Sequence, residues 1–133
     1  MTEYGAGPKK ILIAEDDEEM REMYKMIFAK RPDYEIDIES GATEALHKTK
    51  EKSYDLVVID IIMSPVSGDT LFVNLRNDKR TMRVPILVVS VLDQEALSNL
   101  KIMSNCDFLQ KPLDPAKLLE KIRVMTSGNW GRE

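Results

Sequence analysis

The chain has 133 residues, of which 43% are hydrophobic and 32% are charged, and its formal net charge at pH 7 is −4. This composition indicates one folded domain with its own core and excludes a disordered chain. The acidic balance, with no basic stripe among the 19 Lys and Arg residues, disfavours direct nucleic-acid binding.

The sequence also bears on where the protein works. No apolar run approaches the roughly 20 residues needed to cross a bilayer, and residues 1–8 lack the basic and apolar segments of a signal peptide. Cys106 is the only cysteine, so it has no partner for an internal disulfide. We expect a cytoplasmic location, no membrane contact, and one domain at 9–126 between flexible ends at 1–8 and 127–133.

Strand-like and helix-like patterns alternate along the chain. The strand-like segments are short and apolar, and the helix-like segments repeat apolar residues every three or four positions. In chain order we predict a strand at 11–14, a helix at 20–28, a strand at 34–38, a helix at 42–49, a strand at 56–59, a helix at 71–75, a strand at 86–89, a helix at 96–103, a strand at 106–109 and a helix at 118–125. Asp114 is expected to cap the last helix, with Pro115 in its first turn.

This (βα)5 pattern predicts a doubly wound α/β fold with a parallel sheet and right-handed crossovers. The segments 11–14, 56–59 and 86–89 are continuously apolar, as expected for strands buried on both faces. The segments 34–38 and 106–109 are interrupted by polar residues, which suits edge strands. The predicted strand order is therefore 2-1-3-4-5, the flavodoxin-like order.

Polar residues follow four of the predicted strands. Glu15 and Asp16 end the first strand, Asp60 the third and Ser90 the fourth, and the fifth runs into Lys111. In an open parallel sheet, ligands bind at the carboxyl ends of the strands near the point where strand order reverses. We therefore expect these side chains to gather at one edge.

Carboxylates brought together repel by about 4 kcal/mol per pair at 4 Å and an effective dielectric near 20. Lys111 supplies one compensating charge, and a divalent cation would supply two. Oxygen ligands suit Mg²⁺, whereas zinc would require His and Cys ligands in a spacing that this chain lacks. Asp17, Glu18 and Glu19 have a structural explanation instead, because acids favour a helix N-terminus.

Four segments together resemble the response-regulator receiver family over residues 9–125. Each segment alone is only suggestive, but their order and their places on the strands are specific. They are the acidic segment 10–17, the acceptor segment 55–63 with Gly68 eight residues after Asp60, the switch strand 85–90 and the closing motif 107–113.

The resemblance implies a role for each matching position. Asp60 would accept a phosphoryl group from a phosphohistidine, and the protein would catalyse only its own phosphorylation and dephosphorylation. Asp16 and Asp60, with the backbone carbonyl of Ile62, would bind Mg²⁺, and Glu15 would do so directly or through water. Ser90 would donate a hydrogen bond to the phosphoryl group.

In the same family pattern, Lys111 would pair with the phosphoryl charge, and the Lys111-Pro112 bond would be cis. Phe108 occupies the family's aromatic switch position. Phosphorylation would draw Ser90 inward, and Phe108 would follow and change the face made by the fourth helix, fifth strand and fifth helix. Phe108 as a plain core residue of an edge strand remains an alternative explanation.

The resemblance also implies partners. These would be a sensor histidine kinase or histidine phosphotransfer protein upstream and an effector protein or output domain downstream. A homodimer linked to phosphorylation is possible within the same scheme. The chain could be a stand-alone receiver or the first part of a longer regulator.

The sequence departs from the family pattern around the site. The family usually has proline directly after the residue at Met63, whereas here Ser64 intervenes before Pro65. Val91 replaces a small residue, and Ile62 and Leu92 replace polar residues that often assist the hydrolytic water. We therefore expect slow self-dephosphorylation, and a phosphoryl half-life of seconds would contradict this.

Three other functions would place different demands on these residues. A flavin-binding flavodoxin would need a phosphate loop where the acids 15–19 stand. A haloacid-dehalogenase-type phosphatase would need a second Asp at the position of Ile62. The stronger rival is an interaction module that keeps the receiver shape without being phosphorylated.

Overall fold

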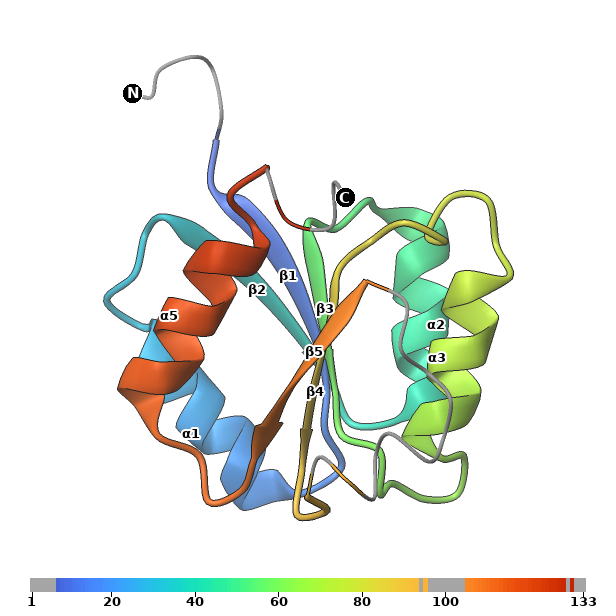
Figure 1. Ribbon diagram of the computed structural model, residues 1–133, viewed down its shortest axis with the longest axis horizontal. Helices are drawn as coiled ribbons and strands as arrows, with labels where there is room; N and C mark the ends of the chain where they lie inside the picture. The colour runs from blue at the N-terminus through green and yellow to red at the C-terminus, as the bar shows by residue number, and fades with distance from the viewer. Residues whose placement is uncertain (1–6, 94, 96–104, 129, 131–133) are drawn as a thin grey trace.

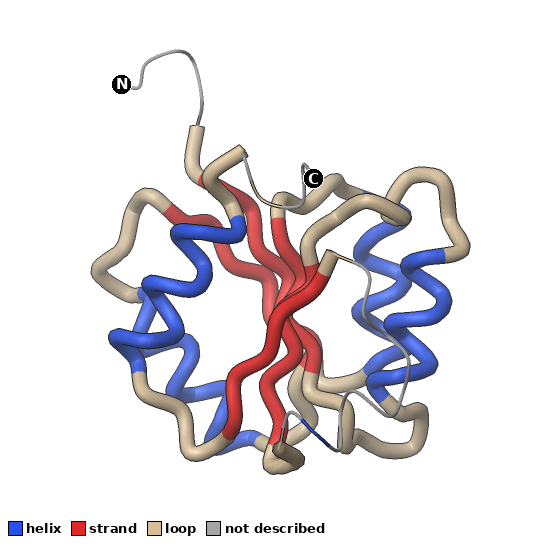
Figure 2. Tube along the Cα trace, in the orientation of Figure 1, coloured by secondary structure: helices blue, strands red, loops and turns tan. Residues whose placement is uncertain are grey.

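The computed structural model describes residues 7–93, 95, 105–128 and 130. In this part of the chain five parallel strands form one sheet, and helices cover both of its faces (Figures 1 and 2). The elements are β1 (Lys9–Ala14), α1 (Glu18–Phe28), β2 (Tyr34–Glu39), α2 (Ala42–Glu51), β3 (Leu56–Ile59), α3 (Gly68–Arg76), β4 (Ile86–Ser90), β5 (Cys106–Gln110) and α5 (Pro115–Met125). The helix predicted at 96–103 lies outside the described residues.

The strand order is β2-β1-β3-β4-β5, which confirms the prediction of a doubly wound sheet. All residues of β3 and β4 are buried, as are the last four of β1. The edge strands β2 and β5 contain no fully buried residue. The continuous apolar segments are therefore central and the interrupted ones are edges, as their solvent exposure requires.

Two apolar cores form because successive side chains of a strand point to opposite faces of the sheet. In β1, Leu12 and Ala14 pack on one side with residues of α2 and α3. Ile11 and Ile13 pack on the other side with residues of α1 and α5. Figure 1 shows this arrangement, with α1 and α5 on one face and α2 and α3 on the other.

Two aspartates set the starts of the helices that flank the site. Asp17 caps α1 by accepting the backbone N–H of Glu19 at 3.1 Å. Asp114 caps α5 by accepting the N–H of Ala116 at 2.9 Å, and Pro115 begins the helix, as predicted. Within the described residues, no helix combines the length and the apolar character needed to span a membrane.

Two peptide bonds are cis, Ser64-Pro65 and Lys111-Pro112. The second was predicted and is confirmed, whereas the first was not anticipated. In the C-terminal segment, Trp130 is partly buried and packs against the core between the sheet and the α1–α5 layer. Gly128 has a φ of 90°, a left-handed conformation that glycine adopts without strain, in the turn that precedes Trp130.

Candidate functional site

The register of the central strands brings the predicted site residues together. Ala14 of β1 pairs with Ile59 of β3, so both strands end at the same level of the sheet. The backbone N–H of Asp60 donates to the Ala14 carbonyl at 3.2 Å and extends this pairing by one residue. The acids that follow the two strands are therefore neighbours at the carboxyl edge.

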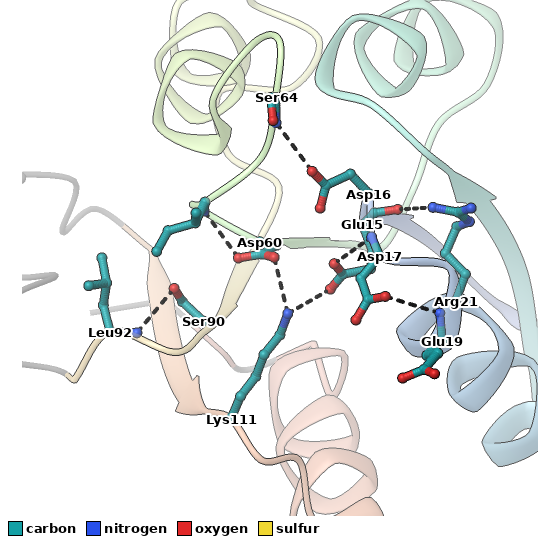
Figure 3. A network of polar contacts seen from close by, with 11 residues as sticks. Glu15, Asp16, Asp17, Glu19, Arg21, Asp60, Ser64, Ser90, Leu92 and Lys111 are labelled. Atoms are coloured by element: carbon teal, nitrogen blue, oxygen red, sulfur yellow. Dashed lines mark hydrogen bonds and ion pairs between the residues drawn. The ribbon is translucent and has the colours of Figure 1, made fainter.

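Three carboxylates meet there. Glu15, Asp16 and Asp60 each offer an oxygen, and these three oxygens lie within 4.8 Å of one another. Glu15 is 1% exposed and Asp60 is 6% exposed, whereas Asp16 is more accessible to solvent. Figure 3 shows the three side chains approaching from β1 and β3.

Lys111 lies between the two buried acids. Its Nζ is 3.1 Å from Glu15 Oε1 and 3.1 Å from Asp60 Oδ2 (Figure 3). Burial lowers the pKa of the Lys111 ammonium, but the hydrogen bonds and charges of the two carboxylates outweigh burial, so the pKa is raised. Lys111 therefore stays charged and offsets part of the negative charge.

One lysine does not neutralise three acids. The pKa of the Glu15 carboxyl is raised to about 7, mainly because the group is buried. The hydrogen bond from the Asp17 N–H and the Lys111 ammonium lower this pKa, whereas the negative charge of Asp60 raises it further. Three oxygen donors with uncompensated charge fit a hard divalent cation such as Mg²⁺, which takes few carboxylates and keeps several waters.

Backbone groups also hold the acids. Asp60 Oδ1 accepts the N–H of Ile62 at 3.1 Å, and Glu15 Oε2 accepts the N–H of Asp17 at 3.1 Å. The Ile62 side chain is 53% exposed, so this residue reaches the cluster through its backbone while its apolar side chain lies at the rim. Arg21 donates to the Glu15 carbonyl at 3.1 Å, a contact that sequence patterns did not indicate.

Ser90 is fully buried at the end of β4. Its hydroxyl accepts the backbone N–H of Leu92 at 3.3 Å, and among the described residues it makes no hydrogen bond to Asp60 or Lys111. The Ser90 carbonyl accepts the N–H of Lys111 at 2.8 Å, which ties the ends of β4 and β5 together. Ser90 is thus beside the cluster, with its hydroxyl engaged by its own loop.

Phe108 lies in the middle of β5, paired with Val88. It is partly buried and packs against the core that faces α2 and α3. The fourth helix of the predicted switch face falls outside the described residues, so only the β5 and α5 parts of that face are described.

The loop from Asp60 to α3 passes close to the acceptor. The N–H of Gly68 donates to the Ile61 carbonyl at 2.9 Å. A Cβ at Gly68 would overlap the carbonyl oxygen of Asp60 and would lie 2.7 Å from Ile61 Cα. Position 68 therefore requires glycine, because the start of α3 lies against the backbone of Asp60 and Ile61. This close approach explains why a glycine stands eight residues after Asp60.

A doubly wound α/β domain with a buried carboxylate, two further acids and a lysine at the carboxyl edge is the arrangement of a signalling receiver, a class without a classical enzymatic role. The response regulator receiver domain model matches residues 11–123. The chain belongs to this family and is a receiver domain of two-component signalling.

Known relatives agree with this assignment. The chain is 29% identical over 119 residues to the response regulator Rre1 of Synechocystis, covering 89% of this chain and 52% of that protein. It is 30% identical over 116 residues to the nisin biosynthesis regulatory protein NisR of Lactococcus lactis, covering 86% and 49%. The chain thus spans about half the length of these curated relatives.

Solved structures share the fold. The Francisella response regulator 1452 receiver domain is 28% identical with a TM-score of 0.79, covering 91% of this chain and 98% of that one. TrrA of Thermotoga maritima, solved in complex with Mg²⁺-BeF, is 28% identical with a TM-score of 0.77, covering 88% and 98%. The receiver domain of the Pseudomonas aeruginosa sensor histidine kinase PA1611 has a TM-score of 0.80 at 20% identity, covering 90% and 98%, and holds a magnesium ion in its active-site cleft.

Proposed function

We propose that Asp60 accepts a phosphoryl group from a phosphohistidine on a sensor histidine kinase or a histidine phosphotransfer protein. The burial of the Asp60 carboxylate beside Lys111 and two further acids is the observation that carries this proposal. A carboxylate oxygen of Asp60 forms the new O–P bond while the P–N bond breaks, and the imidazole keeps the electron pair and takes up a proton. Such a transfer depends on positioning and charge neutralisation more than on covalent chemistry.

Lys111 and Ile62 position the acceptor. Lys111 holds Asp60 Oδ2, and the Ile62 N–H holds Asp60 Oδ1, so the carboxylate plane is fixed before the donor arrives. As the phosphoryl group joins Asp60, the Lys111 ammonium is close enough to pair with its added negative charge. Preformed contacts of this kind avoid reorganisation during the reaction.

Mg²⁺ would be held by Asp16, Asp60 and the backbone carbonyl of Ile62, with Glu15 binding directly or through water. When bound, the cation supplies two positive charges to the phosphoryl oxygens and the crowded acids. The compact set of three carboxylate oxygens supports this assignment. The magnesium-bearing receiver neighbours support it by analogy.

We assign the switch to Ser90 and Phe108. A hydroxyl can donate as well as accept, so Ser90 can release the Leu92 N–H and donate to a phosphoryl oxygen. Phe108 lies on the neighbouring strand, paired with Val88 two residues before Ser90, and it packs partly buried against the core that faces α2 and α3. The phosphoryl group then favours one of two packings of this face, which an effector protein, an output domain or a second copy recognises.

The phosphorylated state should be long-lived. Ile62 and Val91 are 53% and 59% exposed beside the site, and Leu92 is partly buried. None of the three side chains can orient a water molecule for attack on the phosphoryl group. The protein therefore catalyses little hydrolysis of its own aspartyl phosphate. We place the protein in the cytoplasm, where its kinase partners have access to ATP.

The proposal is tested with Mg²⁺ and either beryllofluoride or a small phosphodonor. Intact-mass spectrometry should show one added phosphoryl group, and ¹⁵N spectra should shift around Asp60 with beryllofluoride. Asp60→Asn should abolish both responses. Asp55→Asn, at the other end of the same strand, is the matched control and should keep them. No response in the parent protein would refute the proposal and favour an interaction module that works without phosphorylation.

A further inference from the structure

Asp16 differs from the other two acids of the cluster in how it is held. Glu15 is fixed by Lys111 and by the Asp17 N–H, and Asp60 by Lys111 and by the Ile62 N–H. Among the described residues, the carboxylate of Asp16 has a single hydrogen-bond donor. It is the backbone N–H of Ser64, 3.2 Å from Asp16 Oδ2.

This contact joins segments that are far apart in sequence. Asp16 follows β1, and Ser64 lies in the loop between β3 and α3, 48 residues later. Figure 3 shows the Asp16 side chain turned toward that loop and away from Lys111. Asp16 is less buried than Glu15 and Asp60, and the Ser64 amide is the hydrogen-bond donor that its carboxylate has among the described residues. The Ser64 amide is therefore the group that aims this carboxylate.

The identity of residue 64 matters because only a non-proline residue carries an amide hydrogen. A proline at this position would leave Asp16 Oδ2 without its donor. In this chain the proline stands one residue later, at Pro65, so an N–H is available at Ser64. The departure in the loop thus has a chemical consequence at the metal ligands.

We propose that the Ser64 backbone amide is a positioning group that holds Asp16 in place for Mg²⁺. This inference rests on the proposed metal site. The Asp16 carboxylate has further lone pairs, so it can accept the amide and still face the cation. Because binding is reciprocal, Mg²⁺ that fixes Asp16 must in turn restrict the β3–α3 loop through the same hydrogen bond.

Magnesium affinity separates the amide from the serine side chain. In calorimetric titration with Mg²⁺ alone, Ser64→Ala removes the hydroxyl, keeps the N–H, and should bind as the parent does within about twofold. Ser64→Pro removes the N–H and should weaken binding about tenfold, the usual effect of losing a group that orients a metal ligand. The double variant Ser64→Pro/Pro65→Ser keeps the composition, moves the N–H by one residue, and should bind as weakly as Ser64→Pro.

A second measurement reads the hydrogen bond without metal. Amide hydrogen exchange by ¹⁵N NMR should show the Ser64 N–H protected in the Mg²⁺-free parent protein and unprotected in Asp16→Ala. Adding Mg²⁺ to the parent should shift the Ser64 amide resonance. This measurement decides the question even if the proline variants do not fold, which circular dichroism would show.

The outcomes distinguish this inference from the proposed function. If the parent protein and a folded Ser64→Pro variant bind Mg²⁺ equally well, the positioning role is overturned and the receiver function stands. Equal exchange of the Ser64 amide in the parent and in Asp16→Ala would also overturn it. Parent protein that does not bind Mg²⁺ would overturn both.

Discussion

Replacing Gly68 with alanine should destabilise the domain and disturb the acceptor together. The added Cβ would overlap the Asp60 carbonyl oxygen and would lie 2.7 Å from Ile61 Cα and 2.8 Å from the Asp60 carbonyl carbon, where real contacts of a Cβ essentially never fall below 3.0 Å. All three neighbours are backbone atoms, so no rotamer change can relieve the overlap. The backbone that carries Asp60 must move instead.

The magnitude follows from two opposing effects. Overpacking of this kind costs about 1–3 kcal/mol, and the loss of glycine flexibility in the unfolded chain returns about 0.4–1 kcal/mol. The net loss should be about 1–2 kcal/mol in the free energy of unfolding, or about 3–6 °C in Tm for a domain of this size.

Urea unfolding followed by circular dichroism measures this loss. Gly7→Ala is the matched control, because an added Cβ there meets nothing within 4 Å, and it should change stability by less than about 0.5 kcal/mol. Beryllofluoride binding, followed by NMR, should weaken in Gly68→Ala and be unchanged in Gly7→Ala. A Gly68→Ala variant as stable as the parent would refute the close approach of the two backbone segments.

Two further predictions concern ionisable groups away from the site. Burial of the Asp37 carboxyl acts to raise its pKa, but the hydrogen bonds from Lys52 and Tyr54 outweigh burial, so the net effect is a lowered pKa. The ionised Asp37 therefore stabilises the folded domain fully above about pH 4. This stabilisation is lost as the pH falls through the lowered pKa. Asp37→Asn should therefore cost about 1 kcal/mol at pH 7 and less once the pH falls below the lowered pKa of Asp37. An equal cost across this acid range in urea unfolding would contradict this. Burial also raises the pKa of the Cys106 thiol to about 11. Alkylation by iodoacetamide at pH 7 should be more than about 100-fold slower than in urea, where the pKa returns toward 8.5; equal rates would exclude this burial.

The strand order could be predicted from the sequence because the polarity pattern of each strand indicates how deeply that strand is buried. The apolar segments that became β1, β3 and β4 could only be central, and the alternation from Tyr34 onward could only suit an edge. Asp114 and Pro115 marked the start of α5 because capping depends on local chemistry. The first turn of α3 was missed, since the helix starts at Gly68 and its opening residues lack the apolar spacing that indicated 71–75.

Contacts that join distant loops were not predictable from patterns. The Ser64 amide reaches Asp16 only because the β3–α3 loop folds back over the sheet edge. Arg76 likewise donates to the carbonyls of Val84 at 2.8 Å and Asn105 at 3.0 Å, which belong to separate loops. Every non-proline residue carries the same backbone donor and acceptor, so the residue type does not indicate which of these groups meets a distant partner.

At the site itself, the sequence predicted which side chains lie near one another. Glu15, Asp16, Asp60 and Lys111 follow from strand ends and the parallel register. The bond between the Ser90 hydroxyl and the Leu92 N–H was not anticipated, because the hydroxyl was expected to serve the phosphoryl group. Its partner depends on a turn after β4 that is set by tertiary structure rather than by strand pattern.

Trp130 gives the domain a built-in optical probe. It is the only tryptophan of the chain, and it lines a hollow with Asp107 near the start of β5 and Val124 near the end of α5. Lys111 follows the opposite end of β5 from Asp107. Indole fluorescence should therefore report on the docking of the C-terminal segment onto α5, and a change in emission on adding a ligand would signal a change transmitted along the strand rather than contact with the indole.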